Sequence, residues 1–390
     1  MPLNRPTAVI GSAIMVPVTT DRSSHEEILY EVSQAALKSA GMTIEQIDGI
    51  LVGSNDQIDG RAISVMMASG SVGGVDRDIL STPSAGEHAF VMGVLRVASG
   101  QFETQLVLAW GLTEATSLPE VERLAADPYF HRRLPLDDLS SFALQANALV
   151  NAHPEAEQAV GKVIEQNRRR GAKAYPEVAG TVDTAAQIGA AKMFRWPLRE
   201  GMVRPPTHGV VALVLASDAF VKKAGSANPA WIRGMGWATE AALLGDRDLT
   251  AAAALQEAAR QAFEDAGIGG IAEVDVAEIS GPTPYQELIA YQALGLAGPD
   301  GWATLLDGQQ QRPAVNPSGG IASLNPVFCG GLVRIAEAAN QVRGTAGPHQ
   351  TAGARTALGH AASGPAMMYQ TVVVFGKEPV SDQAPNFIGE

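Results

Sequence analysis

The feature that most constrains the fold is an ordered repeat of apolar strands and helices in the two halves of the chain. In the first half, a helical run is followed by Gly41, and in the second half a similar run is followed by Gly267. Glycine is the residue that most often ends a helix in the left-handed conformation, so both positions predict a helix end. The first copy spans the apolar runs 8–11, 28–40 and 47–52, and the second spans 254–266 and 274–279.

A second pair of segments continues the same order. An amphipathic run at 89–100 is closed by glycine and followed by the strand-like run 106–109, and we match these with 332–344 and 367–375. Helices that alternate with short apolar strands predict α/β layers with largely buried sheets. Similarity between alanine-rich helices explains one matched pair, but ordered matches across several elements favour a duplicated architecture.

Length and composition limit the classes of protein that the chain can belong to. A chain of 390 residues exceeds a single core and predicts about two units. The net charge of −13 gives no general basic surface for nucleic acid or anionic lipid. The one tight basic run, 168–170, is either a solvated helix face or a receiver of phosphates from a nucleotide-like ligand. We expect no membrane span.

The single cysteine, Cys329, excludes an intrachain disulfide framework and is typical of a reducing compartment. No secretion signal is evident at the N-terminus, so we expect a cytoplasmic protein. The section from 117 to 206 is polar and rich in proline, and we interpret it as an irregular insertion that caps the first core unit. The predicted units are then 1–225, which includes this insertion, and 226–390.

A glycine-rich motif points to a family. The chain carries Asn316-Pro317-Ser318-Gly319-Gly320, then Leu324-Asn325-Pro326, and a helical run that ends in Gln341-Val342-Arg343-Gly344. This pattern resembles the signature loop of the thiolase superfamily, and the resemblance covers nearly the whole chain. It is closest to the sterol-carrier-protein-type thiolases and their bacterial and archaeal relatives. The resemblance implies the thiolase fold, in which two βαβαβαββ halves form five αβαβα layers with an inserted loop region.

The resemblance also implies catalytic positions, and the first is the nucleophile. The family places a cysteine at the start of a buried helix, where the helix dipole lowers its pKa. Registering 83–89 on that motif puts Pro83 at the cysteine position. Ser84 is adjacent and is a candidate nucleophile if a base activates it, although it is also a plausible helix cap. His88 is a candidate base facing the ligand, or a packed or surface histidine.

The second position is the histidine of the family's Gly-His-Pro motif, which is Asn325 here. An asparagine amide can bind a thioester oxygen but does not accept a proton near neutral pH. Cys329 follows four residues later at a predicted helix start, which gives a thiol some thiolate character. The family usually has a small residue near the ligand tunnel there, so a buried structural cysteine is the alternative.

The third position is a polar loop that resembles the family's His-Asp-Ala-Phe or Asn-Glu-Ala-Phe element. Ser280 and Gly281 replace its polar residues. Tyr285 is a candidate hydrogen-bond donor to a carbonyl, or a buried tyrosine at a helix start. The fourth position is a C-terminal loop in which many thiolases carry a second cysteine. His360 lies there and is a candidate acid/base, or a structural histidine.

The binding surface is implied in the same way. The family scaffold predicts an acyl-CoA pocket, with coenzyme A thioester as the ligand and free helix N–H groups for its pyrophosphate. The residues that we assign to this pocket are Gly319, Gly320, Ser280, His88 and Cys329. No phosphate-loop, dinucleotide or metal-ligand motif occurs, so we expect no metal and no covalently bound cofactor. His208 lies in a strand that the family uses architecturally.

Three functions follow from the resemblance. The first is a non-catalytic or divergent acyl-CoA-binding subunit in a heteromeric complex of acyl-CoA metabolism, as a homodimer or as a heterotetramer with a catalytic paralogue. Relatives in this branch also pair with small zinc-ribbon/OB-fold (DUF35-type) proteins. The second is retro-aldol cleavage of a 3-hydroxyacyl-CoA with His360, Tyr285 and Ser84. The third is ordinary acetyl-CoA acyltransferase chemistry, which is the least favoured. The acyl group, pathway and stoichiometry do not follow from the sequence.

Overall fold

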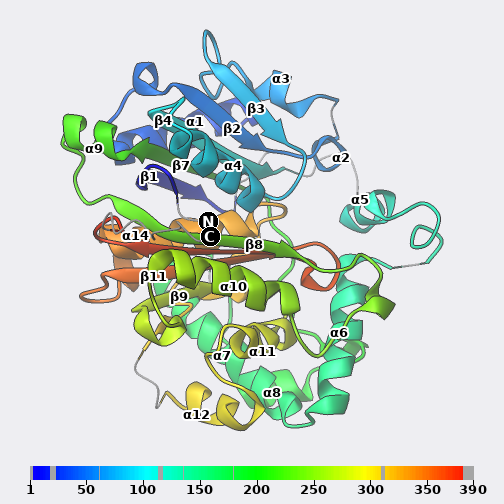
Figure 1. The fold of residues 1–390 in the computed structure, drawn as a ribbon. Coiled ribbons are helices and arrows are strands. Elements are labelled where there is room, and N and C mark those ends of the chain that lie inside the picture. Colours follow the sequence, from blue (N-terminus) through cyan, green and yellow to red (C-terminus); the bar gives the residue numbers. More distant parts are fainter. Residues whose placement is uncertain are drawn as a thin grey trace, which may run out of the picture.

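A ten-stranded mixed sheet and the helices that cover it form the body of the protein in the computed structural model (Figure 1). The structure describes residues 3–17, 23–60, 62–112, 117–134, 136–178, 180–308 and 312–380. The strand order is β10-β9-β11-β12-β8-β1-β7-β4-β2-β3. The two halves of the sheet meet at β1 and β8, where Ala8 pairs with Trp231 and Val9 with Ala230. The sheet therefore consists of an N-terminal and a C-terminal half.

Each half contributes five strands in the same order. The N-terminal half runs β1 (Thr7–Met15), β7 (Gly209–Ser217), β4 (Thr104–Gly111), β2 (Gly49–Gly53) and β3 (Asp78–Thr82). The C-terminal half runs β8 (Ala230–Thr239), β12 (Tyr369–Gly376), β11 (Thr356–Ser363), β9 (Val276–Ile279) and β10 (Ala314–Val315). In both halves the first two pairings are antiparallel and the last two are parallel. The predicted duplication is confirmed.

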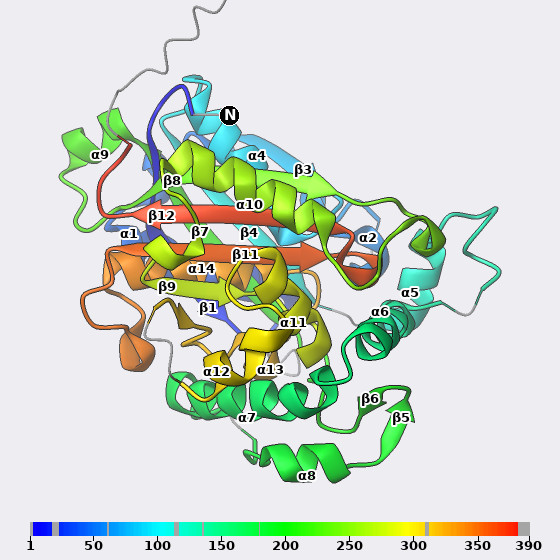
Figure 2. The same ribbon diagram turned by 60° about the horizontal axis from the view of Figure 1, so that its bottom comes forward.

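Four helices complete the layers, and these are α1 (His25–Ala40), α4 (Gly86–Ala98), α10 (Ala253–Ala266) and α14 (Gly330–Arg343). Alternate residues of β7 show how the layers form. Val211 and Leu213 pack with α4 and α14 in a central core, while Val210 and Val214 pack with α1 on the opposite face. In the C-terminal half, α10 covers the outer face. The layers are therefore α1, sheet, α4 with α14, sheet, and α10. Figure 2 shows the outermost helix of the C-terminal half, α10, lying across β8.

The glycine caps predicted from the sequence have the conformation expected of helix ends. Gly41 ends α1 with φ of 67°, and Gly267 ends α10 with the same φ. At the other end of α1, Ser24 accepts a hydrogen bond from the Glu27 amide, and the Glu27 carboxylate accepts one from the Ser24 amide. This reciprocal capping box satisfies amides that a helix start leaves unpaired.

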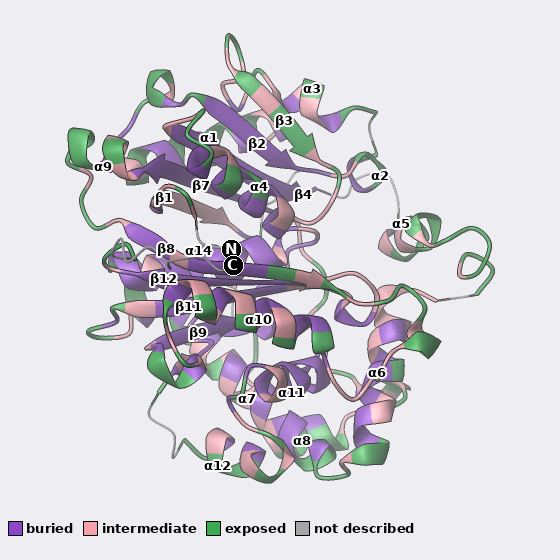
Figure 3. Ribbon diagram, in the orientation of Figure 1, coloured by how far each residue is buried: buried purple, intermediate pink, exposed green. Residues whose placement is uncertain are grey.

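The section from 117 to 206 differs from the sequence prediction in two ways. It is mostly helical, with α5 (Leu118–Ala125), α6 (Asp138–Ala152), α7 (Ala156–Ala174), α8 (Ala185–Ala190) and the short strands β5 (Met193–Arg195) and β6 (Leu198–Arg199). The expectation that it caps the first unit is wrong. Val160 and Ile164 of α7 share a core with Leu255 and Leu288, so the insertion covers the C-terminal half. Its outermost part, around α5, is largely exposed (Figure 3).

Shorter helices complete the chain, and they are α2 (Asp56–Asp59), α3 (Ser64–Ala68), α9 (Asp218–Ala224), α11 (Pro284–Ala293), α12 (Trp302–Leu306) and α13 (Gly320–Ser323). The segment around His360, predicted as a loop, is the buried strand β11. The run 367–375, matched above with 106–109, is instead the counterpart of β7. A strand with glycine and alanine lacks the β-branched residues that mark strands in a sequence. No helix in the described part of the chain has the length and apolar character needed to cross a membrane.

Candidate functional site

The signature loop, which we define as residues 316–326, is held by a buried ion pair. Glu278 of β9 accepts hydrogen bonds from the amide and the hydroxyl of Ser318, at 3.0 and 2.6 Å. Arg334 of α14 donates to the same carboxylate at 2.8 Å, and both charged side chains are fully buried. Burial lowers the pKa of Arg334, and the negative charge of Glu278 opposes that shift. A buried charge pair of this kind is costly to break, so it fixes the loop.

A second buried network joins the signature loop to the insertion. Glu287 of α11 accepts hydrogen bonds from Asn167 of α7 at 2.8 and 2.9 Å and from Asn316 at 2.9 Å. Tyr291 also donates to this carboxylate, and burial raises the pKa of Glu287. Gly319 has φ of 92°, and a Cβ there would lie 2.6 Å from the Asn167 carbonyl oxygen. In this structure the glycine thus permits close packing of α7 on the loop.

The start of α4 is the place where the family motif puts its nucleophile. Pro83 is exposed there, and Ser84 is half-buried. The N-cap of α4 is Ala85, so Ser84 does not cap this helix. The Gly86 amide donates to the Phe328 carbonyl at 3.0 Å. His88 is half-buried, and its ring meets the edge of Tyr369 with 5.5 Å between ring centroids.

The start of α14 lies against the start of α4 but is closed to solvent. Cys329 is the N-cap of α14, is fully buried, and points its thiol at the Gly209 carbonyl, 3.6 Å away. Burial raises the pKa of this thiol, and the negative charge of Glu87 raises it further. The helix N-terminus is expected to lower a thiol pKa, but here desolvation has the larger effect. Cys329 is therefore a protonated thiol within the core.

Glu87 is a buried acidic residue at this junction that the sequence reasoning missed. It is 1% exposed, and among the described residues its Oε1 has no hydrogen-bond partner. A Cβ on Gly331 would lie 2.6 Å from Glu87 Oε2, so the carboxylate sits directly against the start of α14. A negative charge is stabilised at a helix N-terminus. The sequence signal was an acidic residue in the first turn of α4, which is indistinguishable from an ordinary helix-start preference.

The remaining family positions separate into accessible and inaccessible groups. Asn325 is half-buried, and its amide donates to the Arg204 carbonyl at 2.7 Å. Ser280 is fully buried, and its hydroxyl has no hydrogen-bond partner among the described residues. Tyr285, in the first turn of α11, is 2% exposed, and burial raises its pKa to about 12. Of these three residues, Asn325 is partly accessible, while Ser280 and Tyr285 are buried.

His360 lies in β11 beside Ile279, the residue that precedes Ser280. It is fully buried, and its Nε2 is 2.7 Å from Gln370 Oε1. Because Gln370 uses its own amide to donate to the Met367 carbonyl, His360 is the donor in this contact. Burial lowers the pKa of His360 to about 4, so the ring is neutral near pH 7. Its Nδ1 has no hydrogen-bond partner among the described residues.

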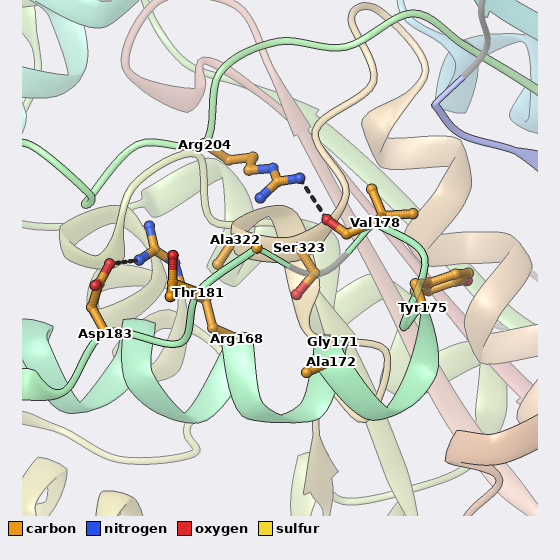
Figure 4. Close-up of a pocket in the computed structure, with 11 residues that line it drawn as sticks. Arg168, Gly171, Ala172, Tyr175, Val178, Thr181, Asp183, Arg204, Ala322 and Ser323 are labelled. Carbon is orange, nitrogen blue, oxygen red and sulfur yellow. Dashed lines mark hydrogen bonds and ion pairs between the residues drawn. The ribbon is translucent and has the colours of Figure 1, made fainter.

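A polar pocket of about 220 Å³ opens where the insertion meets the signature loop (Figure 4). Arg168 and Tyr175 come from the last turns of α7 and its end, Ala322 and Ser323 from the signature loop, and Arg204 from the segment before β7. The pocket is completed by Gly171, Ala172, Val178, Gly180, Thr181 and Asp183. Of the basic run 168–170, only Arg168 lines it. Arg169 is exposed and pairs with Glu165, while Arg170 bonds to Gln166.

The comparisons with known proteins agree with this architecture. Residues 236–377 match the model of a family described as "Thiolase C-terminal domain-like". The chain is 26% identical to rabbit (Oryctolagus cuniculus) sterol carrier protein 2 over 382 residues, which cover 88% of this chain and 66% of that protein. It is 25% identical to an acetyl-CoA acetyltransferase of Methanothermobacter thermautotrophicus, over 86% of this chain and 91% of that enzyme. Residues 236–377 therefore form a thiolase C-terminal-like domain, and the whole chain is similar to proteins of the thiolase superfamily.

Its similarity to sterol carrier protein 2 points to the sterol-carrier-protein-type branch, and the chain spans just under two thirds of the rabbit protein. The fold matches a solved Ltp2-ChsH2(DUF35) aldolase with a TM-score of 0.78, 16% identity and coverage of 96% and 99% of the two chains. It matches a monomeric SCP2-thiolase like protein type 1 of Mycobacterium smegmatis with a TM-score of 0.76, 19% identity and coverage of 97% and 79%. Human mitochondrial 3-ketoacyl-CoA thiolase in complex with CoA has a TM-score of 0.70, 16% identity and coverage of 96% and 99%. The predicted thiolase fold is confirmed.

Proposed function

We propose that this thiolase-superfamily chain binds an acyl-CoA without forming an acyl-enzyme, as a divergent or accessory subunit of an acyl-CoA-metabolising complex. One observation carries the proposal. Pro83 stands where the family motif has its nucleophilic cysteine, and the one cysteine of the chain, Cys329, is fully buried. Burial also raises the pKa of that thiol, and the thiolate is the nucleophilic form.

The binding part of the proposal comes from relatives of the chain. A human thiolase of the same fold was solved in complex with CoA, and the archaeal relative is an acetyl-CoA acetyltransferase. Ser84, His88 and Asn325 are half-buried, stand at or beside the positions where the family motif has its catalytic residues, and can donate hydrogen bonds to a thioester. Gly319, Gly320, Ser280 and Cys329 support this region from within the core in our proposal.

The assembly part of the proposal has two components. The neighbour with the TM-score of 0.78 is an aldolase complex that includes a DUF35 protein, and we propose a partner of that type, or a catalytic paralogue, for this chain. We also propose a homodimer through β3, an edge strand that exposes Leu80. Met92 and Leu95 of α4 are exposed as well. An uncovered apolar edge strand is a pairing surface that monomers usually protect.

A second candidate function is retro-aldol cleavage of a 3-hydroxyacyl-CoA, which the likeness to the aldolase favours. Such a reaction needs an acid/base group but no acyl-enzyme. Tyr285 and His360 are both buried in the free chain, and a conformational change or a partner would have to expose them. Ser84 and His88 are more accessible candidates. Ordinary acyl transfer through Ser84 or Cys329 is the least supported function.

The decisive experiment combines three measurements on the same preparation. Calorimetric titration with coenzyme A and a stable acyl-CoA analogue measures binding. Intact-mass analysis after incubation with a reactive acyl-CoA detects an adduct, and Ser84→Ala and Cys329→Ala identify its site. Turnover of a 3-hydroxyacyl-CoA, with and without a DUF35-type partner, measures retro-aldol activity, with His360→Ala and Tyr285→Phe as variants.

We expect binding, no adduct, and no turnover by the chain alone. A stoichiometric adduct that disappears in Ser84→Ala or Cys329→Ala would refute the proposal and restore acyl transfer. Turnover lost in His360→Ala but unchanged in Cys329→Ala would establish the retro-aldol candidate instead. Absence of any coenzyme A binding would refute both functions.

A further inference from the structure

We propose that the pocket lined by Arg168, Arg204 and Tyr175 is a binding site for a small organic oxyanion, bearing either a carboxylate or a phosphoryl group. This inference goes beyond the proposed function, because the oxyanion can belong to coenzyme A or to an unrelated metabolite. The pocket lies on the α7 side of the signature loop, and the start of α4 belongs to the opposite, central layer.

Arg204 provides the charge. Its Nη2 donates to the Val178 carbonyl at 3.0 Å, and this is the one hydrogen bond that its side chain makes to the described residues. Within the described ranges, no carboxylate forms an ion pair with it. A guanidinium has five N–H donors in a rigid plane and stays charged at any physiological pH. Figure 4 shows this head group reaching over the pocket, so most of its donors remain for a ligand.

Arg168 and Asp183 form the opposite wall. Arg168 Nη1 contacts Asp183 Oδ2 at 2.6 Å, and its Nη2 donates to the Gly201 carbonyl. One carboxylate therefore balances one of the two arginines, and the pocket keeps a net positive charge of one. The net charge of the whole chain is −13, so the positive charge of this pocket is opposite in sign to that of the chain. A single negatively charged group would complete the balance.

The rest of the lining fits the organic part of such a ligand. Tyr175, Ala172 and Ala322 offer apolar surface, while Thr181 at the exposed rim offers a hydroxyl. The volume of about 220 Å³ is below the roughly 300–1,000 Å³ of sites for drug-sized molecules. The pocket therefore suits a compact acid or one end of a larger phosphorylated molecule.

The pocket is also joined to the family's catalytic region through the signature loop. Ser323 lines the pocket and donates to the Asn167 carbonyl, and two residues later Asn325 donates to the Arg204 carbonyl at 2.7 Å. Asn325 occupies the histidine position of the family motif. The residue that would hold the ligand, Arg204, is thus linked to that position by one hydrogen bond, from the Asn325 side-chain amide to the Arg204 backbone carbonyl.

The test uses three probes with the intact chain: coenzyme A, adenosine 3′,5′-bisphosphate and benzoate. Affinity is measured by calorimetry at low and at 0.5 M salt for wild type, Arg204→Gln and Arg204→Lys. Arg169→Gln is the matched control, because Arg169 lies on the same helix next to Arg168 but faces solvent. Thr181→Glu is a second variant, because it places a carboxylate at the exposed rim without touching the core.

We expect at least one probe to bind, with a loss of about 10- to 100-fold in Arg204→Gln, as for a charge-assisted hydrogen bond. Arg204→Lys and Arg169→Gln should retain more of the affinity, Thr181→Glu should lose it, and added salt should weaken binding. Binding of coenzyme A and the bisphosphate identifies a phosphoryl site, and binding of benzoate alone identifies a carboxylate site.

Two results would overturn the inference: no probe binds at millimolar concentration, or Arg204→Gln and Thr181→Glu both bind every probe as tightly as wild type. Failure of the proposed function is a separate outcome. If coenzyme A and every other probe bind Arg204→Gln and Thr181→Glu as tightly as wild type, the proposed function stays intact and this pocket is refuted. Benzoate binding that is lost in Arg204→Gln, together with no binding of coenzyme A, would support this pocket and refute the proposed function.

Discussion

The two sides of the signature loop differ in what they offer a ligand. On the central side, where α4 and α14 begin, the ionisable groups Glu87, Cys329 and His360 are buried. On the α7 side, Arg168 and Arg204 line an open polar pocket. The same loop therefore lies between a region of buried ionisable groups and a solvent-accessible, charged pocket.

The difference shows how a scaffold can keep its architecture while its chemistry changes. Desolvation raises the pKa of the Cys329 thiol and lowers that of His360 to about 4, so both groups are uncharged near neutral pH. Arginine is not neutralised in this way, and it remains charged at the edge of the pocket. The arginines on the α7 side thus line an accessible pocket, where we propose anion binding, and the four predictions below test that contrast.

The largest effect on stability should come from the buried Glu278–Arg334 ion pair, which holds the signature loop between the two sides. Glu278→Ala leaves Arg334 buried without its partner, and we expect the free energy of unfolding to fall by about 3–5 kcal/mol. Urea unfolding at pH 7 measures this change. Arg260→Ala, which removes the exposed helix-surface ion pairs with Glu257 and Glu264, should change it only slightly. Equal effects of the two variants would show that the loop does not depend on the buried pair.

The second prediction concerns the buried His360 on the central side and the pH dependence of stability that it causes. The folded pKa of His360, about 4, lies below its unfolded value of about 6.5, so between these pH values the unfolded chain binds more protons. Stability should therefore fall as pH drops from 6.5 to 4, by on the order of 3 kcal/mol from this group. His360→Asn keeps a donor for Gln370 and should flatten this part of the stability curve.

Urea unfolding of wild type and His360→Asn at pH 7 and pH 5 provides the measurement. His131→Asn, at a half-buried histidine after α5, is the control and should follow wild type. If His360→Asn loses as much stability as wild type between the two pH values, the histidine is not buried in solution.

The third prediction is the protection of the Cys329 thiol. Because the side chain is fully buried and its thiolate is disfavoured, Ellman's reagent at pH 8 should react at least about a hundredfold more slowly with the folded chain than with the denatured chain. Ligand binding at the Arg204 pocket should not change this rate. Rapid reaction of the folded chain would show that the central side opens and would remove the contrast.

The smallest expected effect on stability concerns the solvent-accessible pocket on the α7 side. Asp183→Asn removes the partner of Arg168, whose ion pair is partly exposed, so stability should change by less than about 1 kcal/mol. Affinity for an anionic probe should instead increase severalfold, because the pocket gains net positive charge. Calorimetry with benzoate or coenzyme A measures this gain, and Asp307→Asn, which removes the more exposed ion pair with Lys162, is the matched control.

Part of this structure follows from local sequence patterns. Gly41 and Gly267 end their helices as expected, and the repeated order of helix and strand gives two halves with the same strand order. The strand at 356–363 was missed because its alanines, glycine and histidine carry no strand signal. The insertion was assigned to the wrong half, because composition does not say which surface a segment covers.

The candidate site divides in the same way. Asn325 and Cys329 were found because they lie at motif positions, and Cys329 does lie at a helix start as predicted. Glu87 and Arg204 were missed, since neither residue belongs to a pattern that distinguishes it from a surface charge. Arg168, Arg169 and Arg170 are neighbours in sequence, but a helix turns by about 100° per residue, so only Arg168 faces the pocket.

The sequence by itself therefore determined the duplicated α/β plan, the helix ends and the signature loop, because each depends on backbone preferences and short-range periodicity. Tertiary structure alone decided which charges are buried and which remain available. The pKa of a thiol or an imidazole depends on groups brought near it from distant segments, such as Glu87 beside Cys329 and Gln370 beside His360. The same long-range packing placed Arg204 and Arg168 around one cavity.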